Sequence, residues 1–138
     1  MAGFEITEHT ADVGVSATGA DFEEALASLA TGMFSVMAHP ETVRSVRSWQ
    51  VEVDSADREA LVIDWLNELL YRYEAEGLVP KVYRVSVGES GESLVADCTG
   101  ELLDPQRHRP GTVVKAATYH GLEISHNDEW RIRVVLDV

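Results

Sequence analysis

Two acidic segments at opposite ends of the chain carry the residue types best suited to chemistry. The first is residues 9–12 (HTAD) and the second is residues 136–138 (LDV). Carboxylate and carbonyl oxygens are the ligands that calcium and magnesium prefer. Two carboxylates about 4 Å apart repel each other by ~4 kcal/mol at an effective dielectric constant of about 20. If the fold brings Asp12, Asp137 and the terminal carboxylate of Val138 together, they therefore need a cation, either a metal ion or a lysine.

Lys115 is the candidate lysine. It lies in an otherwise nearly uncharged segment, residues 112–120 (TVVKAATYH). A lysine in an apolar strand must reach solvent or find a partner, because burying an unpaired charge is strongly unfavourable. Two interpretations stay open: Lys115 protects an edge strand from aggregation, or it is a functional residue close to Asp12 or Asp137.

The other polar candidates are histidines and a pair of acids. No His-x-x-x-His or Cys-x-x-Cys spacing occurs, so zinc is not expected. His9 and His120 could converge, although a single histidine in a turn more often makes hydrogen bonds or a cap. Asp64 and Glu68 lie four residues apart on one helical face. They are either paired acids for general acid–base chemistry or the solvated side of that helix.

Composition limits the kind of partner. The chain has 138 residues, which fits one domain over 1–138, and a net charge of −13 from 11 basic and 24 acidic residues. Nucleic-acid binding needs clustered cations, so independent RNA or DNA binding is not expected. Residues 107–109 (RHR) are the one basic concentration, and we interpret them as a solvated loop, with contact to an acidic partner as the alternative.

The single cysteine and the hydropathy pattern indicate a cytoplasmic protein. Cys98 cannot form an intrachain disulfide and reads as a small buried apolar residue, which suits a reducing compartment. No stretch approaches the ~18 uncharged apolar residues of a membrane span, so no membrane association is expected.

Hydrophobic periodicity predicts an α+β fold, with antiparallel β-sheet layers covered by two α-helices. Asp21, with Glu24 three residues later, is placed to cap the first helix, and Gly77 is placed to end the second. Short turns between successive strands favour antiparallel pairing. The predicted helices are 22–37 and 57–76, and the predicted strands are around Phe4 and Ile6, 13–17, 46–53, 81–87, 93–98, 112–119, 122–125 and 130–137.

Four segments taken together resemble the archease family. They are HTAD at 9–12, DWLNELLY at 64–71, KAATYH at 115–120 and the terminal LDV at 136–138. His108 and Gly111, ahead of the lysine, are also similar to the family pattern. The resemblance spans nearly the whole chain in the family's order, and Ala117 departs from it because a bulkier aliphatic residue is often found there.

This resemblance implies an accessory protein and not an enzyme. Archeases assist a GTP-dependent RNA ligase in tRNA splicing and RNA repair, by promoting guanylylation and repeated turnover of the ligase. The resemblance implies a divalent metal, calcium first with magnesium or manganese as alternatives, held by Asp12, Asp137 and a terminal oxygen of Val138. It also implies partner activation through its remaining site residues, which are His9, Lys115 and His120.

Two other functions fit the same residues. One is a small metal-dependent phosphoester hydrolase in which Asp12, Asp137, His9 and His120 hold a cation that activates water. The other is a protein-binding module that holds no metal. Turnover of a phosphoester substrate by the chain alone would indicate the hydrolase. Absence of calcium and magnesium binding would indicate the module without metal.

Overall fold

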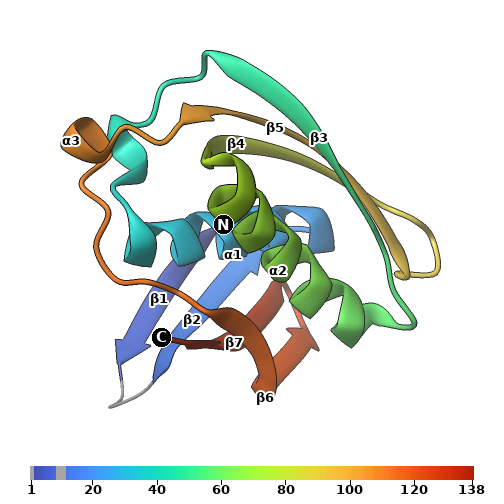
Figure 1. Cartoon of the computed structure of the whole chain (residues 1–138). Helices are drawn as coiled ribbons and strands as arrows, with labels where there is room; N and C mark the ends of the chain where they lie inside the picture. Colours follow the sequence, from blue (N-terminus) through green and yellow to red (C-terminus); the bar gives the residue numbers. More distant parts are fainter. Residues whose placement is uncertain (1, 9–11) are drawn as a thin grey trace.

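Two antiparallel β-sheets with two long helices between them form the fold (Figure 1). The computed structural model describes residues 2–8 and 12–138. None of the described helices is long and apolar enough to cross a membrane. The elements are β1 (Gly3–Glu8), β2 (Asp12–Gly19), α1 (Phe22–Met37), η1 (Pro40–Thr42), β3 (Arg47–Asp54), α2 (Arg58–Glu76), β4 (Leu78–Val87), β5 (Ser93–Leu102), α3 (Pro105–His108), β6 (Ala116–His126) and β7 (Trp130–Asp137).

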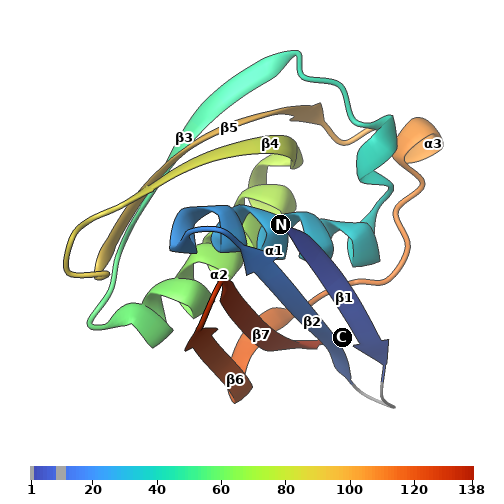
Figure 2. The ribbon, with the colours of Figure 1, turned by 180° about the vertical axis from the view of Figure 1, so that it is seen from behind.

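The α+β class that the sequence predicts is confirmed. One sheet has the strand order β1-β2-β7-β6, and the other has the order β3-β5-β4. All neighbouring strands are antiparallel. Figure 2 shows from behind that the two sheets form the outer layers.

Both long helices begin where the sequence predicts, because acidic side chains cap them. The Asp21 carboxylate accepts the backbone N–H of Glu24 at 2.7 Å, and the Glu24 carboxylate accepts the N–H of Ala20 at 2.9 Å. This reciprocal pair satisfies two N–H groups at the start of α1. At α2 there is a single capping bond, in which the Asp57 carboxylate accepts the N–H of Ala60 at 2.8 Å. α2 ends at Gly77, whose φ of 69° a glycine adopts without a Cβ clash.

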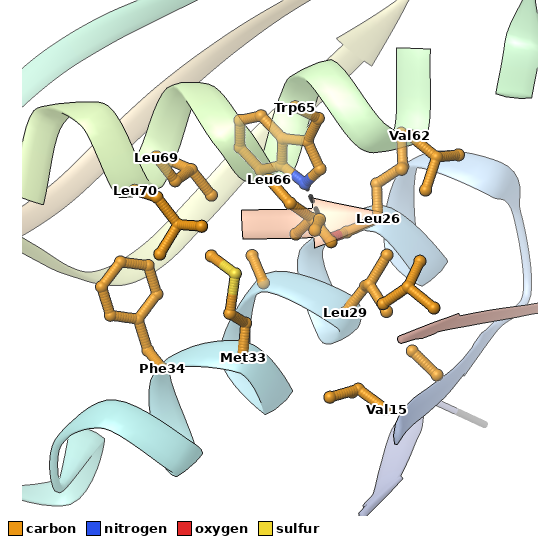
Figure 3. Close-up of a cluster of buried hydrophobic side chains, with 14 of the residues drawn as sticks. Val15, Leu26, Leu29, Met33, Phe34, Val62, Trp65, Leu66, Leu69 and Leu70 are labelled. Atoms are coloured by element: carbon orange, nitrogen blue, oxygen red, sulfur yellow. Dashed lines mark hydrogen bonds between the residues drawn. The ribbon is translucent and has the colours of Figure 1, made fainter. Parts of the chain in front are cut away.

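The helices are buried from both sides because they lie between the sheets. α1 packs against β1, β2 and β7 and also against β4, whereas α2 packs against β6 of one sheet and β3 of the other. α1 accordingly has nine buried residues among its 16, whereas α2 keeps a solvated side that carries Asp64. In the centre, the indole N–H of Trp65 on α2 donates to the carbonyl of Leu26 on α1 at 3.1 Å (Figure 3).

Cys98 is a buried apolar residue, as predicted. It lies on β5 between its partners Trp49 on β3 and Tyr83 on β4. Burial, with a smaller contribution from the charge of Asp97, raises the pKa of the Cys98 thiol to about 12. The thiol is therefore protonated and unreactive at neutral pH.

The strands expected at 112–119 and 122–125 form one strand that begins later. β6 starts at Ala116, and residues 112–115 precede it without strand structure. The physical reason is that Ala116 pairs with Asp137, where β7 ends. β7 therefore offers no partner to the apolar residues before Ala116.

The interpretation of residues 107–109 as a solvated loop is wrong. Arg107 and His108 belong to α3, and His108 is fully buried. Arg107 forms an ion pair with Glu101 on β5, and the Nε2 atom of His108 lies 3.2 Å from the same carboxylate. A buried carboxylate requires such donors, which explains why this basic segment folds inward. Arg109 alone is exposed as expected.

Candidate functional site

Asp12 and Asp137 lie directly opposite each other on β2 and β7. The side of β7 that faces the helices carries the buried residues Ile132, Val134 and Leu136. Successive side chains of a strand point to opposite faces, so Asp137 points to the outer face of the sheet. Residues paired in this way have Cβ atoms about 5 Å apart on one face. Asp12 and the C-terminal segment therefore meet at one end of the four-stranded sheet, where Figure 1 marks the C-terminus.

A shallow pocket of about 250 Å³ lies over this acidic pair. Its lining consists of Asp12 from β2, Val135 and Asp137 from β7, and Thr118 and His120 from β6. The Thr118 hydroxyl donates to the carbonyl of Val135 at 3.0 Å, which holds this side chain against β7. Three strands thus supply polar groups to one small area, and the predicted His120 is among them.

Lys115 adjoins the pocket through its main chain. Its backbone N–H donates to the carbonyl of Asp137 at 2.7 Å, and its side chain is exposed. Lys115 precedes β6, so the interpretation as a lysine within an edge strand is wrong. His9, which we also expected near the site, lies outside the described residues.

A bulge in β6 directs His120 into the pocket. Thr118 pairs with Val135 and Glu123 pairs with Arg133, so five steps along β6 match two steps along β7. Gly121 allows this path with a φ of 73°, and its carbonyl accepts a hydrogen bond from the Arg133 guanidinium at 3.3 Å. Bulges commonly re-aim side chains in this way.

The donor set fits a hard divalent cation. Asp12 and Asp137 offer carboxylate oxygens, and the main-chain oxygens of Val138 follow Asp137 directly in the chain. The Val138 side chain is packed against the core, which fixes this end of the strand. Within residues 2–8 and 12–138, no three His, Cys, Asp or Glu residues cluster as a metal site. A cation held here would complete its shell with water and main-chain oxygen, as calcium and magnesium do.

The acids on α2 have structural partners. The Asp64 carboxylate accepts a hydrogen bond from the Ser55 hydroxyl at 2.7 Å, and Glu68 pairs with Arg72 at 3.0 Å. They lie across α2 from the packed core, in agreement with the solvated-side interpretation. Neither lines the pocket over Asp12 and Asp137.

Asn67 is the polar residue of α2 that sequence reasoning missed. Its amide oxygen accepts the backbone N–H of Ala117 at 2.8 Å, and its amide N–H donates to the carbonyl of Ala117 at 3.3 Å. The sequence feature that could have identified Asn67 is its amide side chain next to the apolar Leu66 in the helical segment 64–71. That position indicates a side chain that satisfies backbone groups of a neighbouring element.

Comparisons with known proteins identify relatives of this chain. The sequence matches the family model described as "Archease protein family (MTH1598/TM1083)" over residues 4–138. It is 40% identical over 143 residues to a protein named "Protein archease" from Thermococcus kodakarensis, with 100% of both chains covered. It is 36% identical over 141 residues to the protein of that name from Methanothermobacter thermautotrophicus, again with 100% of both chains covered.

A solved structure shares the fold. The solution structure of protein 1598 from Methanobacterium thermoautotrophicum matches this chain with a TM-score of 0.83 at 33% sequence identity. The match covers 99% of each chain. The paired sheets and the helices between them are therefore common to both proteins.

Proposed function

Because this chain belongs to the archease family, we propose that it activates a GTP-dependent RNA ligase in tRNA splicing or RNA repair. It would do so by promoting guanylylation of the ligase and its multiple turnover. The observation that most supports this proposal is the pairing of Asp12 with Asp137, because it brings two acidic residues of the family resemblance, far apart in sequence, into one site.

In this proposal, Asp12, Asp137 and a main-chain oxygen of Val138 hold a divalent cation. Calcium is the first candidate, with magnesium or manganese as alternatives. When bound, the cation supplies positive charge that suits phosphate oxygens. The residues of this chain would hold and orient it, and Lys115 and His120 would take part in activating the ligase. Positioning and charge stabilisation are the main requirements of phosphoryl-type chemistry, so a helper protein can raise turnover without itself forming a covalent bond.

The charge of the chain favours contact with the ligase and not with RNA. A net charge of −13 repels a phosphate backbone. We therefore propose that the ligase holds the RNA while this protein contacts the ligase. Its single buried thiol, Cys98, is compatible with the reducing cytoplasm that we propose as its compartment.

The test is ligase guanylylation measured with and without this protein. Asp12→Ala, Asp137→Ala and Lys115→Ala should each lower the stimulation by at least about tenfold, the order expected when a positioned charge is lost. Asp128→Ala is the matched control, because Asp128 is an exposed acid in the β6–β7 turn at the opposite end of the same sheet. Wild-type stimulation by all three folded site variants would refute the proposal.

The same protein preparations separate the two alternatives. Incubation of the chain alone with phosphoester substrates and divalent metals tests the hydrolase, whose activity should vanish in Asp12→Ala. Calorimetric titration with calcium and with magnesium tests the metal, and an absence of binding heat would favour the metal-free module.

A further inference from the structure

Asn67 connects α2 to the strand that forms one side of the candidate site. We infer that Asn67 is a positioning residue, which fixes the segment from Lys115 to Thr118 beside Asp12 and Asp137. The functional part of this inference rests on the proposed function. The geometric part does not, because it concerns the backbone of β6.

The Asn67 amide binds Ala117 as a neighbouring strand would. It accepts the Ala117 N–H at 2.8 Å and donates to the Ala117 carbonyl at 3.3 Å. Both backbone groups of Ala117 therefore point away from β7, toward the free edge of the sheet. Unpaired groups at such an edge would otherwise have to bind water or another chain.

Apart from the core packing of Val114 and Ala117, the bound segment has only a short pairing with a neighbouring strand. Before the bulge, only Ala116, Ala117 and Thr118 are in register with β7. Residues 109–115 form no strand, and residues 119–122 form the bulge. The segment that leads from Lys115 to Thr118 is therefore held by β7 on one edge and by Asn67 on the other.

α2 is a rigid base for this contact. Trp65, Leu66 and Leu69, close to Asn67 in the helix, are buried in the core. The side chain of Asn67 has only two χ angles and is half-buried, so its amide occupies a defined position. Loss of the amide would let the β6 segment move relative to Asp137 while leaving the helix in place.

Arg72 on the same helix provides a matched control. Its guanidinium donates to the carbonyl of Gln50 on β3 at 3.4 Å. β3 is an edge strand of the other sheet. Arg72→Gln weakens this contact from side chain to backbone at an edge of the other sheet, and it also removes the ion pairs of Arg72 with Glu68 and Glu76.

The experiment measures amide hydrogen exchange by NMR and ligase guanylylation for Asn67→Ala, Asn67→Asp and Arg72→Gln. In Asn67→Ala, exchange of the Lys115 and Ala117 amides should accelerate by at least about tenfold, while Val134 in β7 stays protected. Maximal stimulation of the ligase should fall several-fold, with an unchanged half-saturating concentration. Asn67→Asp keeps the acceptor for the Ala117 N–H and should restore part of both properties. Arg72→Gln should leave both unchanged.

The outcomes separate the two proposals. Wild-type exchange at Lys115 and Ala117 in Asn67→Ala would overturn the inference, and so would full ligase stimulation by a variant with accelerated exchange. If Asn67→Ala does not fold, Asn67→Leu replaces it in the same two measurements, because leucine is close to asparagine in volume and offers neither hydrogen bond to Ala117. A wild-type protein that fails to stimulate the ligase would refute the proposed function, whereas the exchange rates would still decide whether Asn67 fixes the strand.

Discussion

Glu101 is a carboxylate whose protonation is controlled by its neighbours. The hydrogen bond from Arg107, together with those from the Arg44 backbone N–H and from His108, holds the pKa of Glu101 well below its usual range, although burial opposes this. His108 accepts the N–H of Asp104 with Nδ1 at 2.9 Å, so Nε2 carries the proton that faces Glu101. This tautomer is assigned from the hydrogen-bond network.

The lowered pKa predicts a specific dependence of stability on pH. A carboxyl with a lower pKa in the folded state stabilises the fold above its unfolded pKa of about 4.3, and this stabilisation is lost as the pH falls below that value. Glu101→Gln should therefore be less stable than wild type at pH 7, by a difference that shrinks at pH 3. Urea denaturation at both pH values measures this difference. Glu89→Gln, an exposed acid in the β4–β5 turn, should show little difference at either pH, and a Glu101→Gln deficit independent of pH would contradict the prediction.

The site was predictable from residue chemistry only in part. Asp12, Asp137 and His120 have side chains whose types indicate ligands or proton carriers, and the structure brings these three to one pocket. Asn67 could not be identified from its residue type, and its one signal was its place in the helix beside the buried Leu66. Its importance comes from the position of the Ala117 backbone, 50 residues away in sequence.

Among the secondary-structure elements, the helices were more predictable than β6. Helices are encoded locally, by caps such as Asp21 and Asp57 and by the repeat of apolar residues. The start of β6 depends instead on where β7 ends, and its bulge depends on the pairing of Thr118 and Glu123 with β7. The partner strand sets where β6 begins and where it bulges. The apolar pattern of residues 112–119 therefore predicts a strand that begins too early.

The junction of β2 and α1 allows a test of close packing between elements. A Cβ atom on Gly19 would lie 2.4 Å from the backbone nitrogen of Ala25 and 2.9 Å from the carbonyl oxygen of Asp21. Backbone atoms in the first turn of α1 cannot move aside as a flexible side chain can. Gly19→Ala should therefore lower the free energy of unfolding by about 2 kcal/mol or more.

The control for this substitution is in the same sheet. A Cβ atom on Gly3 of β1 meets no atom within 4 Å, so Gly3→Ala should change the stability by less than about 0.5 kcal/mol. Chemical denaturation of both variants gives the comparison. Equal stability of Gly19→Ala and wild type would show that the start of α1 can shift to accommodate a methyl group.

At the scale of the whole molecule, the helices are the layer that holds two sheets together. The sequence predicts helices that cover antiparallel sheet, and this is confirmed. It does not specify that both helices have a sheet on each side, because an apolar stripe identifies a buried face without identifying what covers it. α2 contacts both sheets at their edges, through Asn67 to β6 and through Arg72 to β3. The candidate site, on the outer face of one sheet, therefore depends on a helix in the interior.

Trp65 is the residue at which these layers can be tested together. Its indole N–H donates to the carbonyl of Leu26, and its ring packs edge-to-face with Tyr83 at a centroid distance of 6.0 Å. Trp65→Phe removes the hydrogen bond and leaves a void in a fully buried position, so the free energy of unfolding should fall by about 2–4 kcal/mol.

Trp49→Phe is the matched control, because the Trp49 indole nitrogen is buried and has no hydrogen-bond partner within the described chain. Trp49→Phe removes a polar group that makes no hydrogen bond in the folded state. The free energy of unfolding should therefore fall by less than about 1 kcal/mol. Urea denaturation followed by far-ultraviolet circular dichroism measures both variants without relying on tryptophan fluorescence. Equal losses in the two variants would show that the Trp65–Leu26 hydrogen bond does not help to join α1 and α2.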